Sequence, residues 1–191
     1  GMLEASAGRA VVADEELLPF APGSLDAALG VMTLHWVNDL PGTLAQLHAC
    51  LVPDGLLMLA FAGGETLVEL RQVLMEAEID CEGGAGPRVS PFADVRDAGA
   101  LLQRAGFALP VVDADRITVS YPDPLRLMRE LGGMGEANAL VQRRAGPLRR
   151  LTLARACQLY AQRFGDEGGR VPATFEILFL TAWKPHSSQP R

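Results

Sequence analysis

The sequence lacks an excess of basic residues, long apolar runs and a leader pattern, which mark nucleic-acid-binding, membrane and secreted proteins respectively. Its 17 lysine and arginine residues are outnumbered by 23 aspartate and glutamate residues, which gives a net charge of -6 and a pI near 5.1. We therefore expect no nucleic-acid or membrane partner. No apolar run is long enough to cross a bilayer, and no charged-then-apolar leader appears at the start. These absences predict a soluble, cytoplasmic protein.

Cysteine and histidine are also scarce. The three cysteines, Cys50, Cys81 and Cys157, are widely spaced and form no Cys-x-x-Cys pair, which argues against a disulfide framework and a zinc site. The three histidines share no metal-ligand spacing, so we predict no metal centre. The sequence also has no Gly-x-Ser-x-Gly element and no phosphate-binding Gly-Lys-Ser/Thr turn.

What the sequence does contain is an alternation of short apolar runs with helical patterns, which is typical of an α/β domain. With 49% hydrophobic residues in 191, the chain can bury a sizeable core. We expect one domain over residues 1–185, with a helical insertion near 122–165 and a polar tail at 186–191. Strands are predicted at residues 10–13, 25–32, 56–61, 116–121 and 173–183; helices are predicted from about 39, and at 66–77, 94–105, 124–131 and 147–164.

Local signals mark several helix ends. Asp39 can cap a helix whose first turn tolerates Pro41. The segment Thr66-Leu67-Val68-Glu69 has the pattern of a capping box, in which the threonine and glutamate side chains bind amides at the start of their own helix. Gly106 suits the left-handed cap at a helix end. Pro53-Asp54-Gly55 predicts a turn before the third strand.

Residues 8–39 carry a resemblance to a known fold. Glu15-Glu16-Leu17-Leu18-Pro19-Phe20 and Leu34-His35-Trp36 resemble elements that follow the third and fourth strands of S-adenosylmethionine-dependent methyltransferases. The glycine-rich turn that precedes these strands in that fold is absent. The resemblance implies a Rossmann-like class I methyltransferase fold that is N-terminally truncated, without strands 1 and 2. Met2 would then be an internal methionine; alternatively, it is a true start.

A second element narrows the resemblance. Gly64-Glu65-Thr66-Leu67-Val68-Glu69-Leu70-Arg71 resembles a motif of the malonyl-carrier-protein methyltransferases of biotin synthesis. It also resembles a motif of the mitochondrial complex I assembly factors with an arginine hydroxylase role. Four further elements are similar to the assembly-factor group: Glu82-Gly83-Gly84, Ser90-Pro91-Phe92, the segment 133–138 and the segment 171–177. The matches extend from Ala10 to Pro185.

By resemblance, four residues would contact S-adenosylmethionine. Asp14 and Glu15 take the places that bind the adenine, through a carboxylate and a backbone N–H. Gly30 and Val31 stand where the fourth strand ends against the methionine part of the cofactor. The alternatives are that Asp14 only ends a strand beside a turn, and that Gly30 is only a small residue in a tight sheet.

His35 is the one candidate catalytic residue. It follows the fourth strand, where a substrate would approach, and could act as a base or orient the acceptor. Alternatively it is a hydrogen-bonded structural residue. A cluster of arginines is interpreted as a solvated helix face or as a docking site for an acidic protein; it comprises Arg143, Arg144, Arg149, Arg150 and Arg155.

Three functions remain open from the sequence. The parent protein is a cofactor-dependent enzyme acting on a protein substrate of the complex I assembly type, or a malonyl-carrier-protein O-methyltransferase. Alternatively, the shortened chain is a binding or assembly module with no cofactor and no activity. No iron-binding His/Asp constellation supports hydroxylation directly.

The strand order of the complete fold, 3-2-1-4-5-7-6, makes a further prediction. Without strands 1 and 2, residues 25–32 would form an exposed apolar edge with no lysine or proline to protect it. We therefore predict a homodimer built at this edge, with the first twenty or so residues contributing.

Overall fold

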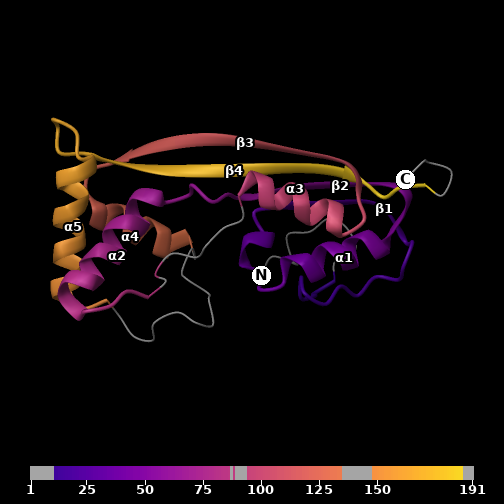
Figure 1. Ribbon diagram of the computed structural model, residues 1–191, viewed down its shortest axis with the longest axis horizontal. Coiled ribbons are helices and arrows are strands. Elements are labelled where there is room, and N and C mark those ends of the chain that lie inside the picture. Colours follow the sequence, from indigo (N-terminus) through magenta and orange to yellow (C-terminus); the bar gives the residue numbers. More distant parts are fainter. Residues whose placement is uncertain (1–10, 87, 89–93, 135–147, 187–191) are drawn as a thin grey trace.

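The centre of the structure is a mixed four-stranded sheet (Figure 1). The computed structural model describes residues 11–86, 88, 94–134 and 148–186. In chain order the strands are β1 (Leu25–Val31), β2 (Leu51–Ala62), β3 (Ala108–Tyr121) and β4 (Val171–Trp183), and they lie side by side in the order β1-β2-β4-β3. β1 is parallel to β2, whereas β4 is antiparallel to both β2 and β3. This is the 4-5-7-6 part of the expected strand order, so the predicted α/β methyltransferase fold is confirmed.

The predicted strand at residues 10–13 is wrong in its described part. Residues 11–13 form no strand, and Val12 is 79% exposed. The predicted turn at 53–55 is also wrong, because these residues lie inside β2, where the pairing with β1 is irregular. Leu25 pairs with Leu51 but Ala27 pairs with Leu56, so extra residues of β2 are accommodated there as a bulge.

The buried side chains form two clusters, and each cluster packs on one half of β4. The strand face that is buried in the first half of β4 is the opposite of the face that is buried in the second half. Successive strand residues point to opposite faces. Leu178 and Leu180 belong to one cluster, the sheet core, whereas Val171 and Ala173 belong to the other, the helical core. The sheet core also includes Leu44, Leu57, Leu59, Phe61, Leu102 and Phe107; the helical core also includes Leu67, Leu70, Val73, Leu74, Ala77, Leu127, Leu131, Leu159 and Tyr160.

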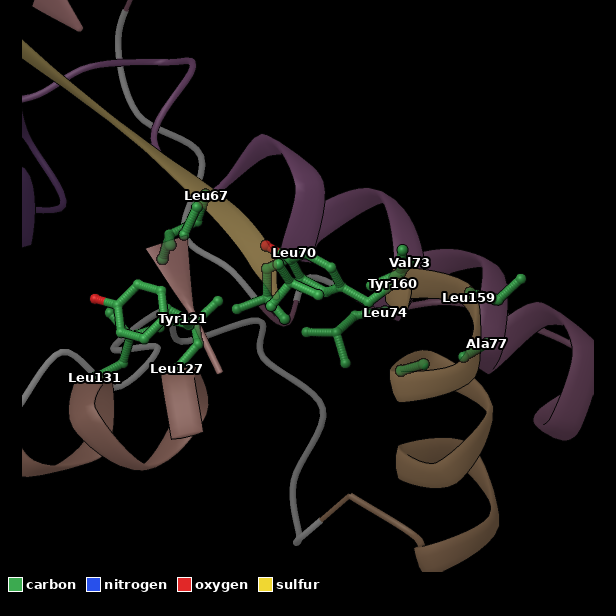
Figure 2. Packing of buried hydrophobic residues seen from close by; sticks show 13 residues of the cluster. Leu67, Leu70, Val73, Leu74, Ala77, Tyr121, Leu127, Leu131, Leu159 and Tyr160 are labelled. Atoms are coloured by element: carbon green, nitrogen blue, oxygen red, sulfur yellow. The ribbon is translucent and has the colours of Figure 1, made fainter. Parts of the chain in front are cut away.

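The helical core joins three helices to the far ends of β3 and β4 (Figures 1 and 2). The helices are α2 (Val68–Glu82), α4 (Pro124–Met134) and α5 (Arg150–Phe164). Tyr160 is fully buried at its centre, and its hydroxyl donates a hydrogen bond of 2.8 Å to the carbonyl of Pro172. Burial raises the pKa of Tyr160, so the phenol remains a protonated donor at neutral pH.

A row of ion pairs joins α2 to α5. Arg155 contacts Asp80 at 2.9 Å, and Arg163 contacts Glu76 at 2.5 Å. Arg149 lies 3.9 Å from Glu82, which also accepts a hydrogen bond from Thr152. Arg149 and Arg155, which belong to the arginine cluster noted in the sequence, therefore pair with acidic side chains of their own chain. Arg143 and Arg144 lie outside the described residues.

The predicted helix caps at Asp39 and Gly106 are confirmed. The Asp39 carboxylate accepts a 2.9 Å hydrogen bond from the amide of Gly42 at the start of α1 (Leu40–Cys50). At the other end of α1, Lys184 donates to the carbonyls of Ala49 and Leu51. α3 (Val95–Arg104) is followed by Gly106, which adopts a φ of 92°.

The predicted capping box at Thr66 and Glu69 is wrong. α2 starts at Val68 after Leu67, which has a φ of 55° and provides no side-chain cap. Thr66 exchanges hydrogen bonds with the backbone of Glu176 instead, and Glu69 accepts hydrogen bonds from the backbone and hydroxyl of Thr174. Both polar side chains therefore bind β4 rather than their own helix.

His48 makes stability depend on pH. Its ring packs edge-on against Phe107, with the ring centroids 5.0 Å apart. Burial and the nearby Lys184 lower the pKa of His48 from its ordinary 6.5, with a partial offset from the Gly106 backbone. As pH falls, His48 binds a proton in the unfolded chain at a higher pH than in the folded chain. The contribution of neutral His48 to the free energy of unfolding is therefore complete above about pH 6.5 and is lost as the pH falls below it. We expect a lower urea midpoint at about pH 5 than at about pH 7, and a smaller difference in His48→Gln. An equal difference in His48→Gln would assign the pH dependence to other groups.

Candidate functional site

The carboxyl ends of the parallel strands β1 and β2 form the candidate site. Ligands of open α/β sheets bind at such ends. β1 ends at Val31, and Met32 turns the chain with a φ of 53° while its amide still donates to the carbonyl of Ala60. A 3-10 helix, η2 (Leu34–Trp36), follows this turn. β2 ends at Ala62 and continues into the Gly63-Gly64 turn.

A small cavity of about 140 Å³ lies between β1, η2, α1 and the segment that precedes β1. The Thr43 side chain lines it, is only 1% exposed, and its hydroxyl has no hydrogen-bond partner within the described ranges. A buried hydroxyl without a partner costs free energy, so a water or ligand atom in the cavity would stabilise it. Other lining residues are Glu15, Leu18, Gly30, Thr33 and Leu59.

Two of the four residues predicted to bind the cofactor, Glu15 and Gly30, line this cavity. A Cβ atom on Gly30 would lie 3.0 Å from the Leu59 side chain, so the missing side chain keeps the cavity open. Val31, the next residue, is 71% exposed and points to the opposite face of the sheet. Of these two residues only Gly30 lines the cavity, together with its neighbours Ala28 and Leu29.

Asp14 lies in an exposed turn before β1. Its carbonyl accepts a 3.0 Å hydrogen bond from the amide of Leu17, and its carboxylate accepts a 2.9 Å hydrogen bond from the amide of Glu16. This is an Asx-type turn, in which one carboxylate oxygen is already engaged. Glu15 is exposed at the tip of this turn.

Glu16 and Gln46 hold this turn against α1. Glu16 stands in the 15–20 element but was not predicted as a site residue, and no pattern pointed to Gln46. The Glu16 carboxylate accepts hydrogen bonds from the amides of Asn38 and Asp39. The Gln46 amide group bridges the turn, because it donates to the Glu16 carbonyl at 2.8 Å and accepts from the Leu18 amide at 3.0 Å. These contacts fix Glu15 and Leu18 at the cavity wall.

His35 lies in η2, half-buried beside Trp36, with the two ring centroids 4.9 Å apart. It follows the carboxyl end of β1, as predicted, but it is not among the residues that line the cavity. The structure therefore places His35 near the site without bringing it together with Glu15 and Gly30.

The loop after β2, residues 63–67, is held by a buried carboxylate from β4. Glu176 is 2% exposed and accepts hydrogen bonds from the Glu65 amide at 3.1 Å and from Arg116 Nε at 3.0 Å. Gly63 packs directly against it, because a Cβ there would lie 2.6 Å from Glu176 Oε2. Arg71 donates to the carbonyls of Gly64 and Thr66. The 64–71 motif thus fixes the loop where the sheet core meets the helical core.

The described residues show neither a metal cluster nor a membrane-spanning helix. Within the described ranges, no group of three or more His, Cys, Asp or Glu side chains is arranged to hold a metal ion. None of the helices described is long and apolar enough to cross a membrane. The Ser90-Pro91-Phe92 element, which the sequence also pointed to, lies outside the described residues.

Comparison with known sequences gives matches along most of the chain. A family model described as a methyltransferase domain matches residues 2–59. The chain is 48% identical over 181 residues to the mitochondrial arginine-hydroxylase NDUFAF5 of Danio rerio, and equally to that of Homo sapiens. These matches cover 95% of the chain, and 56% and 52% of the respective relatives. It is also 41% identical over 189 residues to the malonyl-[acyl-carrier protein] O-methyltransferase of Laribacter hongkongensis, which covers 99% of the chain and 61% of that protein.

Solved structures agree on the fold. The YcgJ protein of Bacillus subtilis superposes with a TM-score of 0.58 at 11% identity, covering 92% of this chain and 70% of that one. A protein of Bacillus halodurans C-125 assigned as a methyltransferase gives 0.57 at 13% identity, with coverages of 91% and 76%. The chain spans about half the length of the NDUFAF5 relatives it matches. The predicted cytoplasmic location is wrong, since the NDUFAF5 relatives are mitochondrial.

Proposed function

Because the chain belongs to the S-adenosylmethionine-dependent methyltransferase family by sequence and fold, we propose that it works within a cofactor-binding protein that modifies arginine side chains of a protein substrate. The observation that carries this proposal is the 48% identity to the arginine-hydroxylase NDUFAF5 over 95% of the chain. The match includes the Gly64–Arg71 region, whose polar groups hold the loop at the carboxyl end of β2.

The described residues would supply part of the cofactor site. A cavity of about 140 Å³ is well below the several hundred Å³ of a typical cofactor pocket, so it would hold one end of the molecule. Glu15 and the free hydroxyl of Thr43 offer polar partners, and Gly30 allows close approach. These features fit a nucleoside end with a polar edge. S-adenosylmethionine supplies an electrophilic methyl group when bound.

His35 has a separate role in this proposal. It follows β1 outside the cavity, on the segment that would face an incoming acceptor. There it orients the acceptor or receives its proton through a ring nitrogen. The alternative from the sequence, a structural histidine that packs on Trp36, makes the opposite prediction for a His35→Ala variant.

A chimera tests the proposal. The segment of Danio rerio NDUFAF5 that aligns with this chain is replaced by residues of this chain, and the products are analysed by mass spectrometry with unmodified NDUFAF5 as the control. We expect the chimera to give the same modified arginine product, in the protein substrate of NDUFAF5, as the unmodified control. His35→Ala in the chimera should reduce product while leaving the melting temperature unchanged. A folded chimera that binds S-adenosylhomocysteine but forms no arginine product would contradict the proposed substrate class.

A second candidate is methyl transfer to a malonyl group on a carrier protein. The 41% identity to the Laribacter hongkongensis enzyme over 99% of the chain favours it. This reaction needs an in-line acceptor and little acid-base assistance, so positioning would supply most of the rate. A second chimera, in which this chain replaces the aligned segment of the Laribacter hongkongensis enzyme, distinguishes malonyl methylation from arginine modification. Methyl ester formation by this chimera, without arginine modification by the first, would favour the second candidate.

A further inference from the structure

Arg71, in the first turn of α2, carries a charge that no described residue neutralises. Its Nη2 donates to the carbonyls of Gly64 and Thr66, so the guanidinium is bound to the loop after β2. Its Nε is buried and has no hydrogen-bond partner within the described ranges. No described aspartate or glutamate forms an ion pair with it. Because a guanidinium is not deprotonated in proteins, Arg71 is a half-buried, permanent cation.

Other arginines of the chain show what such a group binds. Arg88 Nε contacts the Glu78 carboxylate at 2.6 Å, and this carboxylate is fully buried. Arg116 Nε contacts the Glu176 carboxylate at 3.0 Å, although Arg116 itself is largely exposed. Hydrogen bonds from a guanidinium to a carboxylate are among the strongest in proteins, and burial strengthens them. Arg71 Nε therefore offers a carboxylate the same kind of donor.

Two buried carboxylates close to the loop in the fold are engaged elsewhere. Glu69 accepts hydrogen bonds from the amide and the hydroxyl of Thr174. Glu176 accepts hydrogen bonds from Arg116 and from an amide of the loop. Neither carboxylate can turn to Arg71 without leaving these donors unpaired, which costs free energy. A carboxylate that binds Arg71 therefore belongs to another molecule.

Arg71 stands on the acceptor side of the candidate site. The loop that it binds follows the carboxyl end of β2, and η2 with His35 follows the carboxyl end of the neighbouring parallel strand β1. Ligands of open α/β sheets bind beyond these strand ends. The cavity that Glu15 and Gly30 line lies between β1, η2 and α1, and Arg71 is not among its lining residues. The guanidinium is thus outside the proposed cofactor end, in the part that remains for the acceptor.

We propose that Arg71 binds a carboxylate of the acceptor substrate through its Nε–H. The inference rests on the function proposed above and names the group by which the acceptor is held. The bonds from Nη2 to the loop fix the guanidinium in advance, so little side-chain freedom is lost on binding. A protein substrate supplies the carboxylate as an acidic side chain near its target arginine, and a malonyl group supplies its free carboxylate.

Nitrogen-15 NMR of the arginine Nε–H groups tests this binding in the chain itself. The probes are malonate and an amide-capped Glu-Arg dipeptide at constant ionic strength, and Arg71→Lys assigns the signal. The Arg71 signal should shift and saturate with malonate, with the dipeptide or with both, which identifies the source of the carboxylate. The Arg88 signal is the matched control and should not move, because its Nε already faces a carboxylate. No shift with either probe, or an equal shift with uncharged malonamide, overturns the proposal.

Kinetics of the NDUFAF5 chimera test the same contact during the reaction. Arg71→Lys keeps a positive charge at the loop but removes the Nε–H, so KM for the acceptor should rise about tenfold or more. Affinity for S-adenosylhomocysteine and the melting temperature should not change. Arg126→Lys, at a surface pair on α4, should leave KM unchanged. A lower melting temperature of Arg71→Lys, with equal losses for both ligands, would show a structural role and overturn the proposal. An inactive parent chimera would contradict the proposed function alone, because the NMR titration decides carboxylate binding without turnover.

Discussion

Replacement of Glu176 by alanine is expected to lower the free energy of unfolding by about 2–4 kcal/mol. The change removes the buried acceptor of a part-buried hydrogen bond from the Glu65 amide, and the loss of such a hydrogen bond costs about 1–3 kcal/mol. It also empties the space against Gly63, which adds a cavity term. Arg116 contributes less, because its side chain is 63% exposed and remains solvated.

Two further variants make this test specific to the carboxylate. Glu176→Gln retains the shape with only one acceptor oxygen, so its loss should be intermediate. Glu130→Ala removes a carboxylate that pairs with Arg126 on the surface of α4, and should cost about 0.5 kcal/mol or less. Urea unfolding at neutral pH measures all three. Equal losses for Glu176→Ala and Glu130→Ala would show that Glu176 does not hold the loop after β2.

Gly63→Ala should be nearly as damaging, although it adds only one methyl group. The new Cβ would lie 2.6 Å from Glu176 Oε2 and 2.9 Å from the Leu178 side chain, and both neighbours are buried. The Gly63 amide also donates to the Glu176 carbonyl at 2.8 Å, so the backbone cannot move away freely. Forcing a side chain into such a site costs about 1–3 kcal/mol.

Gly132→Ala is the matched control, and its effect should have the opposite sign. Gly132 lies within α4, and an added Cβ would meet no atom of the described residues within 4 Å. Alanine is a better helix former than glycine by about 1 kcal/mol, so this variant should raise the urea midpoint. Destabilisation by both substitutions, or by neither, would contradict the packing described for the loop after β2.

Elements with local signals could be predicted from the sequence. α1 needs only Asp39 as its cap and an apolar stripe, and both signals lie within the helix itself. β1 is a short apolar run between Ser24 and Met32, and the structure confirms it. The same reasoning failed at residues 11–13, which are apolar but have no neighbouring strand in the described structure. A β-strand requires a neighbouring strand for its backbone hydrogen bonds, and the residues of a segment do not show whether such a neighbour is present.

Features that depend on distant partners could not be predicted. Thr66 and Glu69 have the spacing of a capping box, but β4, more than 100 residues later, offers the backbone groups that they bind. Glu16 and Gln46 lie 30 residues apart, and although Glu16 stands in the 15–20 element, nothing in that element indicates Gln46 as its partner. Of the candidate cofactor residues, Glu15 and Gly30 line the cavity, whereas Val31 at the end of β1 is exposed outside it.

We propose that this chain carries part, and only part, of a cofactor site. Calorimetric titration with S-adenosylhomocysteine tests it most directly, using the chain alone, the NDUFAF5 chimera and the chimera with Gly30→Leu, which would fill the cavity. The chimera should bind in the micromolar range. The chain alone should bind about a hundredfold more weakly or not measurably, because two or more polar groups of the ligand would lack partners at about 1.4 kcal/mol each. Gly30→Leu should weaken binding by the chimera without unfolding it. Equal affinity for the chain alone and the chimera, or a folded chimera that does not bind, would contradict the account.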